Sequence, residues 1–151
     1  LRLGWLVLPA WLTDEVAEQK ALDDLASPAL DQLALADLLG RGEVDRHLRR
    51  NRARYRARRD ALVTTLAVHA PQVRVRGIAA GLHVVAELPP QTNEAAVVAA
   101  ARRRSVGVYP MRDYRFGTST APAALVLGYG GLSEPAIRRG VPLLALAISG
   151  G

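Results

Sequence analysis

Apolar positions recur at helical spacing through the first 70 residues of the chain and then change to the alternation typical of strands. A first helix is expected over residues 14 to 26, with Thr13 as its N-cap. A second helix is expected to start at Pro28, a residue favoured at the first helical position, and to end at Gly40 or Gly42. Its buried side is expected to consist of Leu30, Leu33, Ala34 and Leu38.

A third and longer helix is expected from about residue 43 to 69, and it carries most of the unbalanced charge of the chain. Residues 41 to 60 hold nine arginines against three acidic residues, and this window accounts for the whole formal charge of +6. At about 100° per residue, an apolar stripe remains free of arginine along the helix. The stripe consists of Val44, Leu48, Tyr55, Leu62 and Leu66. This pattern favours a solvated cationic face on a helix that docks through its stripe, and an acidic or phosphate partner is the alternative.

The remaining sequence predicts a sheet with two helices. The expected order is a strand at 73–76, a strand at 82–88, a helix capped by Thr92 or Asn93, a strand at 106–109, a strand at 125–129 and a helix capped by Ser133. The closing helix carries Ile137, Val141, Leu144 and Ile148 on one side. We therefore predict a single α+β domain over residues 1–151. It contains a linking segment with helices (1–42), the long helix (43–70) and a small, mostly antiparallel sheet with helices packed on one face (71–151).

Composition excludes several classes of protein. The absence of cysteine excludes a disulfide scaffold, thiolate metal sites and a cysteine nucleophile. The longest apolar run, residues 141 to 148, is too short to span a bilayer, and no secretory signal opens the chain. A soluble, cytoplasmic protein is expected. The three histidines, His47, His69 and His83, have no metal-ligand spacing, so we predict neither a metal site nor a catalytic residue.

The polar stretch from residue 110 to 123 is the best local candidate for a binding site, because it is long for a connection in a compact domain. Arg112 and Arg115 are suited to bind a carboxylate or a phosphate, and Tyr114 supplies a hydroxyl. A solvated surface loop is the alternative. The glycine-rich turn at 128–131 has no lysine after it and is better explained as a tight turn than as a phosphate loop.

Five segments of the sequence, taken together in their order and spacing, resemble the C-terminal part of MocR-type regulators of the GntR family. They are Leu1-Arg2-Leu3-Gly4-Trp5-Leu6-Val7, the stretch from His47-Leu48-Arg49-Arg50 through Tyr55 to Arg58-Arg59-Asp60, Ala80-Gly81-Leu82-His83, Gly107-Val108-Tyr109-Pro110, and Leu127-Gly128-Tyr129-Gly130-Gly131-Leu132-Ser133-Glu134. The resemblance covers nearly the whole chain and implies the C-terminal small domain of a fold-type I aminotransferase.

The resemblance implies a longer regulator in which a winged helix-turn-helix binds DNA and an aminotransferase-like domain binds pyridoxal phosphate and senses an amino-acid-like effector. Arg2 matches the arginine that contacts the cofactor phosphate, while the Schiff-base lysine of the family would precede residue 1. Lys20 does not match that lysine. Because the chain starts at Leu1 without methionine, we expect a fragment that is inactive alone and holds cofactor poorly. The implied partners are the N-terminal part of the same protein and, in a homodimer, a second copy; DNA would be bound only through the winged helix.

The sequence departs from the aminotransferases at one place. Many of them carry a substrate-carboxylate arginine just before the segment that matches Leu127-Gly128-Tyr129, and residues 123 to 126 contain no arginine. Arg112 or Arg115 is then the expected substitute for effector binding. The departure favours a regulator over its first alternative, a piece of a class I/II aminotransferase. A second alternative is an autonomous basic module that binds nucleic acid.

Overall fold

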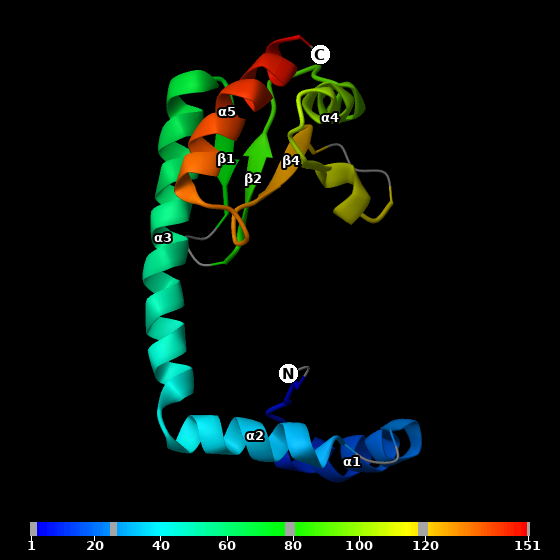
Figure 1. Cartoon of the computed structure of the whole chain (residues 1–151). Coiled ribbons are helices and arrows are strands. Elements are labelled where there is room, and N and C mark those ends of the chain that lie inside the picture. The colour runs from blue at the N-terminus through cyan, green and yellow to red at the C-terminus, as the bar shows by residue number, and fades with distance from the viewer. Residues whose placement is uncertain (1–2, 25–26, 78–80, 118–120, 151) are drawn as a thin grey trace. The chain divides into compact units, whose positions relative to one another are not determined.

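The computed structural model of the chain describes residues 3–24, 27–77, 81–117 and 121–150 (Figure 1). The contacts divide the chain into two compact units, Leu1–Arg50 and Asn51–Gly151. The first unit contains helices α1 (Ala10–Asp24) and α2 (Ala29–Gly40), and the second contains the sheet. The long helix α3 (Glu43–His69) runs without a break through the boundary. Its bounds agree with the sequence prediction.

Helix α1 begins earlier than the sequence predicts, so the assignment of Thr13 as its N-cap was wrong. The amide of Leu12 donates a hydrogen bond to the Pro9 carbonyl at 3.0 Å, and the Thr13 hydroxyl donates to the same carbonyl at 3.3 Å. The first helical turn is therefore already formed at Pro9. The Thr13 hydroxyl therefore forms its hydrogen bond within this first turn. It does not accept a hydrogen bond from an amide of the following turn, as an N-cap side chain would.

Helix α2 has the predicted end, at Gly40, but it does not have the predicted buried side. Pro28 is its N-cap residue and not its first helical residue. No residue of α1 or α2 is buried, and Leu30 and Leu33 are 82% and 67% exposed. The apolar spacing identified the helix correctly, but its apolar side is at most half-buried, at Leu35 and Leu38.

The apolar stripe of α3 is used mainly in the second half of the helix. Leu62 and Leu66 are buried in the core, and Tyr55 packs against the core while half-buried. Leu48, in the first half, is 45% exposed. The predicted docking of the stripe is thus confirmed from Tyr55 onward.

The sheet has four antiparallel strands in the order β1-β2-β4-β3. The strands are β1 (Arg74–Arg76), β2 (His83–Glu87), β3 (Tyr109–Pro110) and β4 (Ala124–Gly128). The third strand lies later than the predicted range of 106–109 and has only two residues. A short 3-10 helix, η1 (Met111–Tyr114), follows it within the stretch that the sequence assigns to a loop.

Helices α4 (Glu94–Arg103) and α5 (Glu134–Ser149) both start at side-chain caps that the sequence predicts. The carboxamide oxygen of Asn93 accepts hydrogen bonds from the amides of Ala95 and Ala96, at 2.9 and 3.2 Å. The Ser133 hydroxyl accepts from the Ala136 amide at 3.3 Å. Each cap satisfies backbone donors that the first turn of a helix leaves without an intrahelical acceptor.

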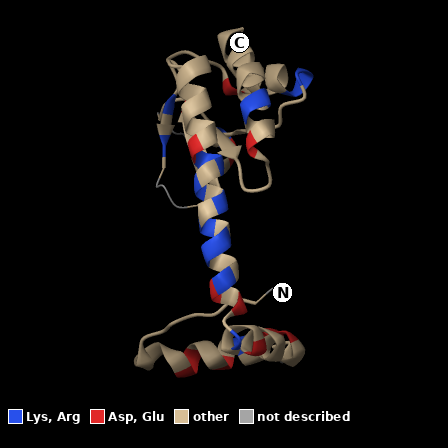
Figure 2. Ribbon diagram, turned by 60° about the vertical axis from the view of Figure 1, so that its left-hand side comes forward, with Lys and Arg blue, Asp and Glu red and all other residues tan. Residues whose placement is uncertain are grey.

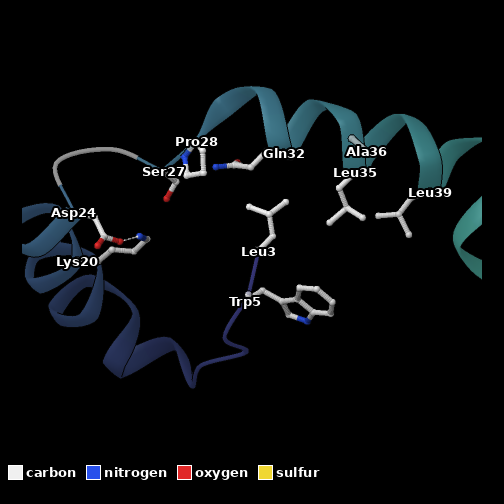
Figure 3. Close-up of a pocket in the computed structure, with 11 residues that line it drawn as sticks. Leu3, Trp5, Lys20, Asp24, Ser27, Pro28, Gln32, Leu35, Ala36 and Leu39 are labelled. Atoms are coloured by element: carbon white, nitrogen blue, oxygen red, sulfur yellow. Dashed lines mark hydrogen bonds and ion pairs between the residues drawn. The ribbon is translucent and has the colours of Figure 1, made fainter. Parts of the chain in front are cut away.

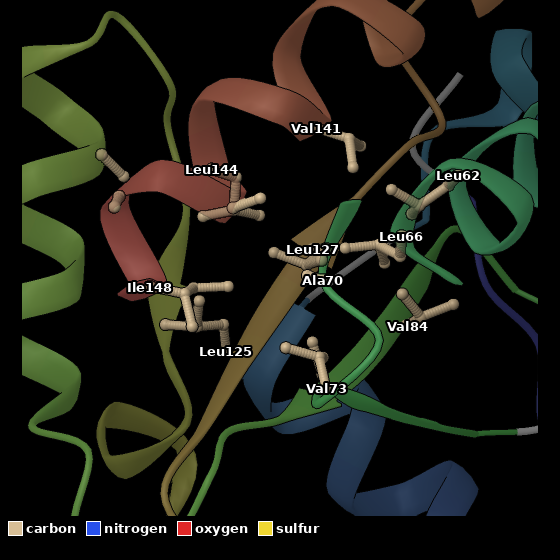
Figure 4. Packing of buried hydrophobic residues seen from close by; sticks show 14 of the residues in the cluster. Leu62, Leu66, Ala70, Val73, Val84, Leu125, Leu127, Val141, Leu144 and Ile148 are labelled. Atoms are coloured by element: carbon tan, nitrogen blue, oxygen red, sulfur yellow. The ribbon is translucent and has the colours of Figure 1, made fainter. Parts of the chain in front are cut away.

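The hydrophobic core lies between the helices and one face of the sheet (Figures 1 and 4). Alternation along the strands places Val84 and Ala86 of β2 on the same face as their cross-strand partners Leu127 and Leu125 of β4. Helices α3, α4 and α5 contribute the other half of the core, including Leu62, Leu66, Val97, Ile137, Val141, Leu144 and Ile148. The opposite face carries His83, which is exposed. The predicted α+β class, with helices on one face of a small antiparallel sheet, is confirmed.

Candidate functional site

The turn that follows β3 is fixed to the rest of the second unit by a buried carboxylate. Glu94, at the start of α4, is only 8% exposed. One of its oxygens accepts a hydrogen bond from the Arg112 amide at 3.1 Å, and the other accepts from the Ala124 amide at 2.7 Å. A buried charged group is stable only when its hydrogen bonds are satisfied, and these two amides provide them. Glu94 therefore connects α4, η1 and the first residue of β4.

The two arginines predicted as binding residues lie in this anchored segment, but their guanidinium groups differ in environment. Arg115 donates to the carbonyl oxygens of Ala121 and Pro122, at 3.2 and 2.9 Å. Its guanidinium therefore closes the loop onto its own backbone. The Arg112 side chain is 62% exposed, and among the described residues Asp113 is the one carboxylate within ion-pair distance of its guanidinium, at 3.6 Å. Arg112 is thus the better placed of the two to meet an anionic ligand.

A second set of contacts joins α3 to the ends of β2 and β4. The Tyr129 side chain is buried, and its hydroxyl donates to the Gly81 carbonyl at 2.7 Å. The Arg58 guanidinium donates to the Gly130 carbonyl and lies over the ring of Tyr55. A Cβ at Gly130 would lie 3.2 Å from side-chain atoms of Leu82, so the turn has little room for a larger residue. Neither Arg58 nor Tyr129 is predicted as a positioning residue from the sequence.

A groove of about 680 Å³ lies beside this turn, near the start of α5. Its lining contains the backbone of four glycines of the adjacent loops and strand, namely Gly107, Gly128, Gly130 and Gly131. His83 and Ser105 are its side chains with polar atoms. The imidazole of His83 packs 3.8 Å from the position that a Cβ of Gly128 would take. The lining offers little charge, so it does not by itself indicate an anion site.

The segment before Leu127-Gly128-Tyr129 forms the first part of strand β4, and apolar residues occupy the place of the expected carboxylate-binding arginine. Ala124 and Leu125 are fully buried, and Val126 is half-buried on the opposite face of the sheet. No guanidinium projects from this strand. Arg112 lies instead in η1, and Arg115 directly follows η1.

The hollow in the first unit does not have the groups that pyridoxal phosphate needs (Figure 3). It measures about 730 Å³, and its lining is largely apolar, with Leu3, Trp5 and Leu35. Lys20 lines it, but the Lys20 amine is held in an ion pair with Asp24. The cofactor requires an amine able to form a Schiff base and a cradle for its phosphate, and the lining contains no arginine. This hollow therefore lacks the groups that would hold the cofactor, and Arg2 lies outside the described residues.

Two further predictions concern metal and membrane. No cluster of three or more histidine, aspartate or glutamate side chains that could hold a metal ion occurs in the described ranges. Likewise, none of the helices in the described part of the chain is long and apolar enough to cross a bilayer.

Comparison with known proteins relates the sequence to regulators. The chain is 31% identical over 148 residues to the uncharacterized HTH-type transcriptional regulator YhdI of Bacillus subtilis, covering 97% of the chain and 31% of the relative. It is 29% identical over 148 residues to the probable rhizopine catabolism regulatory protein MocR of Rhizobium meliloti, covering 97% of the chain and 30% of that protein. The chain thus spans about a third of the length of these relatives. No protein-family model matches it.

Comparison of structures relates the fold to aminotransferases. The α-aminoadipate aminotransferase LysN of Thermus thermophilus, solved with N-(5'-phosphopyridoxyl)-L-leucine, superposes with a TM-score of 0.83 and 27% identity. The superposition covers 95% of the chain and 37% of LysN. An archaeal alanine:glyoxylate aminotransferase superposes with a TM-score of 0.86 at 24% identity, covering 99% of the chain and 37% of that enzyme. The fold is that of fold-type I aminotransferases, and the fold family implies pyridoxal phosphate.

Proposed function

Because this chain is an aminotransferase-like domain homologous to part of the MocR-type transcriptional regulators, we propose that it belongs to the effector-sensing region of a longer regulator. The regulator relatives match nearly all of the chain, while the solved structures of the same fold are aminotransferases. This combination of a regulator sequence with an aminotransferase fold is the observation that carries the proposal. A class I/II aminotransferase is less well supported, because β4 has no arginine to hold a substrate carboxylate.

The proposed regulator binds pyridoxal phosphate, works as a homodimer and contacts its operator through a winged helix-turn-helix. Residues outside this chain supply the Schiff-base lysine, and Arg2 contacts the phosphate, as in the family it resembles. When bound, the cofactor supplies an aldehyde that reacts with amines. The lining of the described hollow supports the further proposal that residues 1–151 alone do not hold it, because the Lys20 amine is engaged with Asp24.

We propose that Arg112 binds the carboxylate of the effector. Its backbone is fixed by Glu94, its guanidinium is exposed, and the neighbouring Asp113 is 3.6 Å away. A guanidinium suits a carboxylate because it donates two parallel hydrogen bonds. Arg115 supports the site by closing the loop through its bonds to Ala121 and Pro122.

The proposal is tested by titrating the complete gene product, loaded with pyridoxal phosphate, with each L-amino acid while recording the cofactor absorbance. We expect at least one amino acid to change the spectrum. Replacement Arg112→Gln should weaken that response by about tenfold to a hundredfold, since a hydrogen bond to a charged group contributes about 1.5–3 kcal/mol. Arg103→Gln, which removes an exposed arginine at the end of α4, is the control and should leave the response unchanged. An equal loss in both variants, or no spectral response to any amino acid, would contradict the assignment.

A further inference from the structure

Helix α3 carries five exposed arginines that the proposed function does not use, in two rows about 150° apart around the helix at about 100° per residue. Figure 2 shows basic residues along this helix. Residues three and four apart are neighbours on a helix surface, so the arginines at 49, 52 and 56 form one row and those at 50 and 54 form a second. We call these two rows the arginine face; it consists of Arg49, Arg50, Arg52, Arg54 and Arg56, all exposed. The buried residues of α3, such as Leu62 and Leu66, lie on another side of the helix.

The arginine face keeps a net positive charge within the described part of the chain, although Asp45 and Asp60 lie four residues from Arg49 and Arg56 on the helix. Among the described residues, no carboxylate lies within ion-pair distance of any of its five guanidinium groups. Arg46, one turn earlier, differs because it pairs with Glu43 at 2.7 Å. Like charges three and four residues apart destabilise an isolated helix, so an anion placed along the rows would stabilise α3.

The side chains between the arginines indicate what kind of anion fits. On this face the arginines are separated by Ala53 and Ala57, and no large apolar side chain lies among them. Protein–protein interfaces are centred on buried apolar or aromatic side chains, which this face does not offer. Contact with a sugar-phosphate backbone needs only donors and positive charge, and small residues between the arginines leave the phosphates room to approach.

The length of the rows also suits a nucleic acid. From Arg49 to Arg56 the helix rises by about 10 Å at about 1.5 Å per residue. Duplex DNA carries one phosphate charge for about every 1.7 Å of its axis, so several phosphates lie within reach of one row. We propose that the arginine face of α3 binds the phosphate backbone of duplex DNA without regard to base sequence. This contact goes beyond the proposed function, which assigns DNA binding to a winged helix that is not among the described residues.

The test measures binding of the 151-residue chain to a fluorescent duplex of about 20 base pairs and arbitrary sequence, by anisotropy between about 50 and 200 mM salt. Each phosphate contact contributes about −0.9 to the slope of log K against log salt. The triple variant Arg49→Gln, Arg52→Gln, Arg56→Gln should therefore reduce the slope by about two to three. The matching triple variant to lysine keeps the point charges and should retain the binding.

A matched control removes the same charge elsewhere. Arg102, Arg103 and Arg139 are exposed and have no carboxylate within ion-pair distance among the described residues. Their joint replacement by glutamine should leave the slope unchanged, and far-ultraviolet circular dichroism should show equal helix content in both triple variants. Three outcomes would overturn the proposal: no salt-dependent binding of the duplex, an equal loss in the control, or binding of polyglutamate in place of DNA. Self-association through the arginine face without DNA binding would also overturn it.

Discussion

Replacement Leu66→Ala should lower the free energy of unfolding of the second unit by about 2–5 kcal/mol. Leu66 is 1% exposed and lies where α3 packs against the sheet and α5 (Figure 4). Truncation removes apolar contacts and leaves a cavity that the surrounding helices cannot close completely. The loss is measured by urea unfolding, followed through the near-ultraviolet circular dichroism of the tyrosines. All four tyrosines lie in residues 51–151, while both tryptophans lie in residues 1–50.

The control for Leu66→Ala is Val68→Ala on the same helix. Val68 is 69% exposed, so its truncation removes little buried area, and the expected change is within about 0.5 kcal/mol. Similar unfolding midpoints for the two variants would show that α3 does not pack on the sheet in the way described.

Replacement Glu94→Ala should destabilise the second unit by about 2–6 kcal/mol. It leaves the amides of Arg112 and Ala124 without their acceptors, and each donor left unsatisfied in a buried place costs about 1–3 kcal/mol. Glu94→Gln should cause a smaller loss, because an amide keeps one acceptor oxygen but turns an NH₂ group toward the second donor. The measurement is the same unfolding experiment, together with hydrogen exchange at these two amides.

Glu134 provides a close control for Glu94, because each glutamate directly follows the N-cap residue of its helix. Glu134 is exposed, and its carboxylate lies 4.0 Å from the Arg138 guanidinium. Glu134→Ala removes a negative charge that interacts favourably with the helix dipole, so the expected loss of stability is about 0.3–1 kcal/mol. If Glu94→Ala cost no more than Glu134→Ala, and amide exchange at Arg112 were unchanged, the anchoring role of Glu94 would be wrong.

Local signals in the sequence predicted the second unit well. The bounds of α3, the caps Asn93 and Ser133, and the buried positions of α5 depend on residues close together in the chain, and the structure confirms them. The strand order was not predicted, because β4 lies between β2 and β3, and β3 is shorter and lies later than its pattern predicts. Where the pattern and the packing partner lie in the same unit, periodicity predicts burial.

The first unit shows where this reasoning fails. The apolar spacing of α2 predicts a buried side, but none of its leucines is buried, and Leu30 and Leu33 are mostly exposed. The start of α1 was predicted wrongly because threonine is a common N-cap residue. In the structure the first helical turn begins at Pro9, so Thr13 lies inside the helix. Apolar periodicity specifies that a helix has a contact face, but not which residues contact it.

The candidate site was predicted only in part, because its anchors are distant in sequence. The loop containing Arg112 and Arg115 was identified by its length and charge. Glu94 contacts it from 18 and 30 residues away, a pairing that no single sequence reveals. Tyr129 and Gly81 are 48 residues apart and Arg58 and Gly130 are 72 apart. Only the fold brings these groups together.

The most direct test of the regulator assignment is a mobility-shift titration of the complete gene product, loaded with pyridoxal phosphate, on the DNA upstream of its own gene. The protein should form a sequence-specific complex whose affinity changes when the amino acid that alters the cofactor spectrum is added. A protein that formed no specific complex, yet converted amino acids to oxo acids over many turnovers, would contradict the account and would be an aminotransferase.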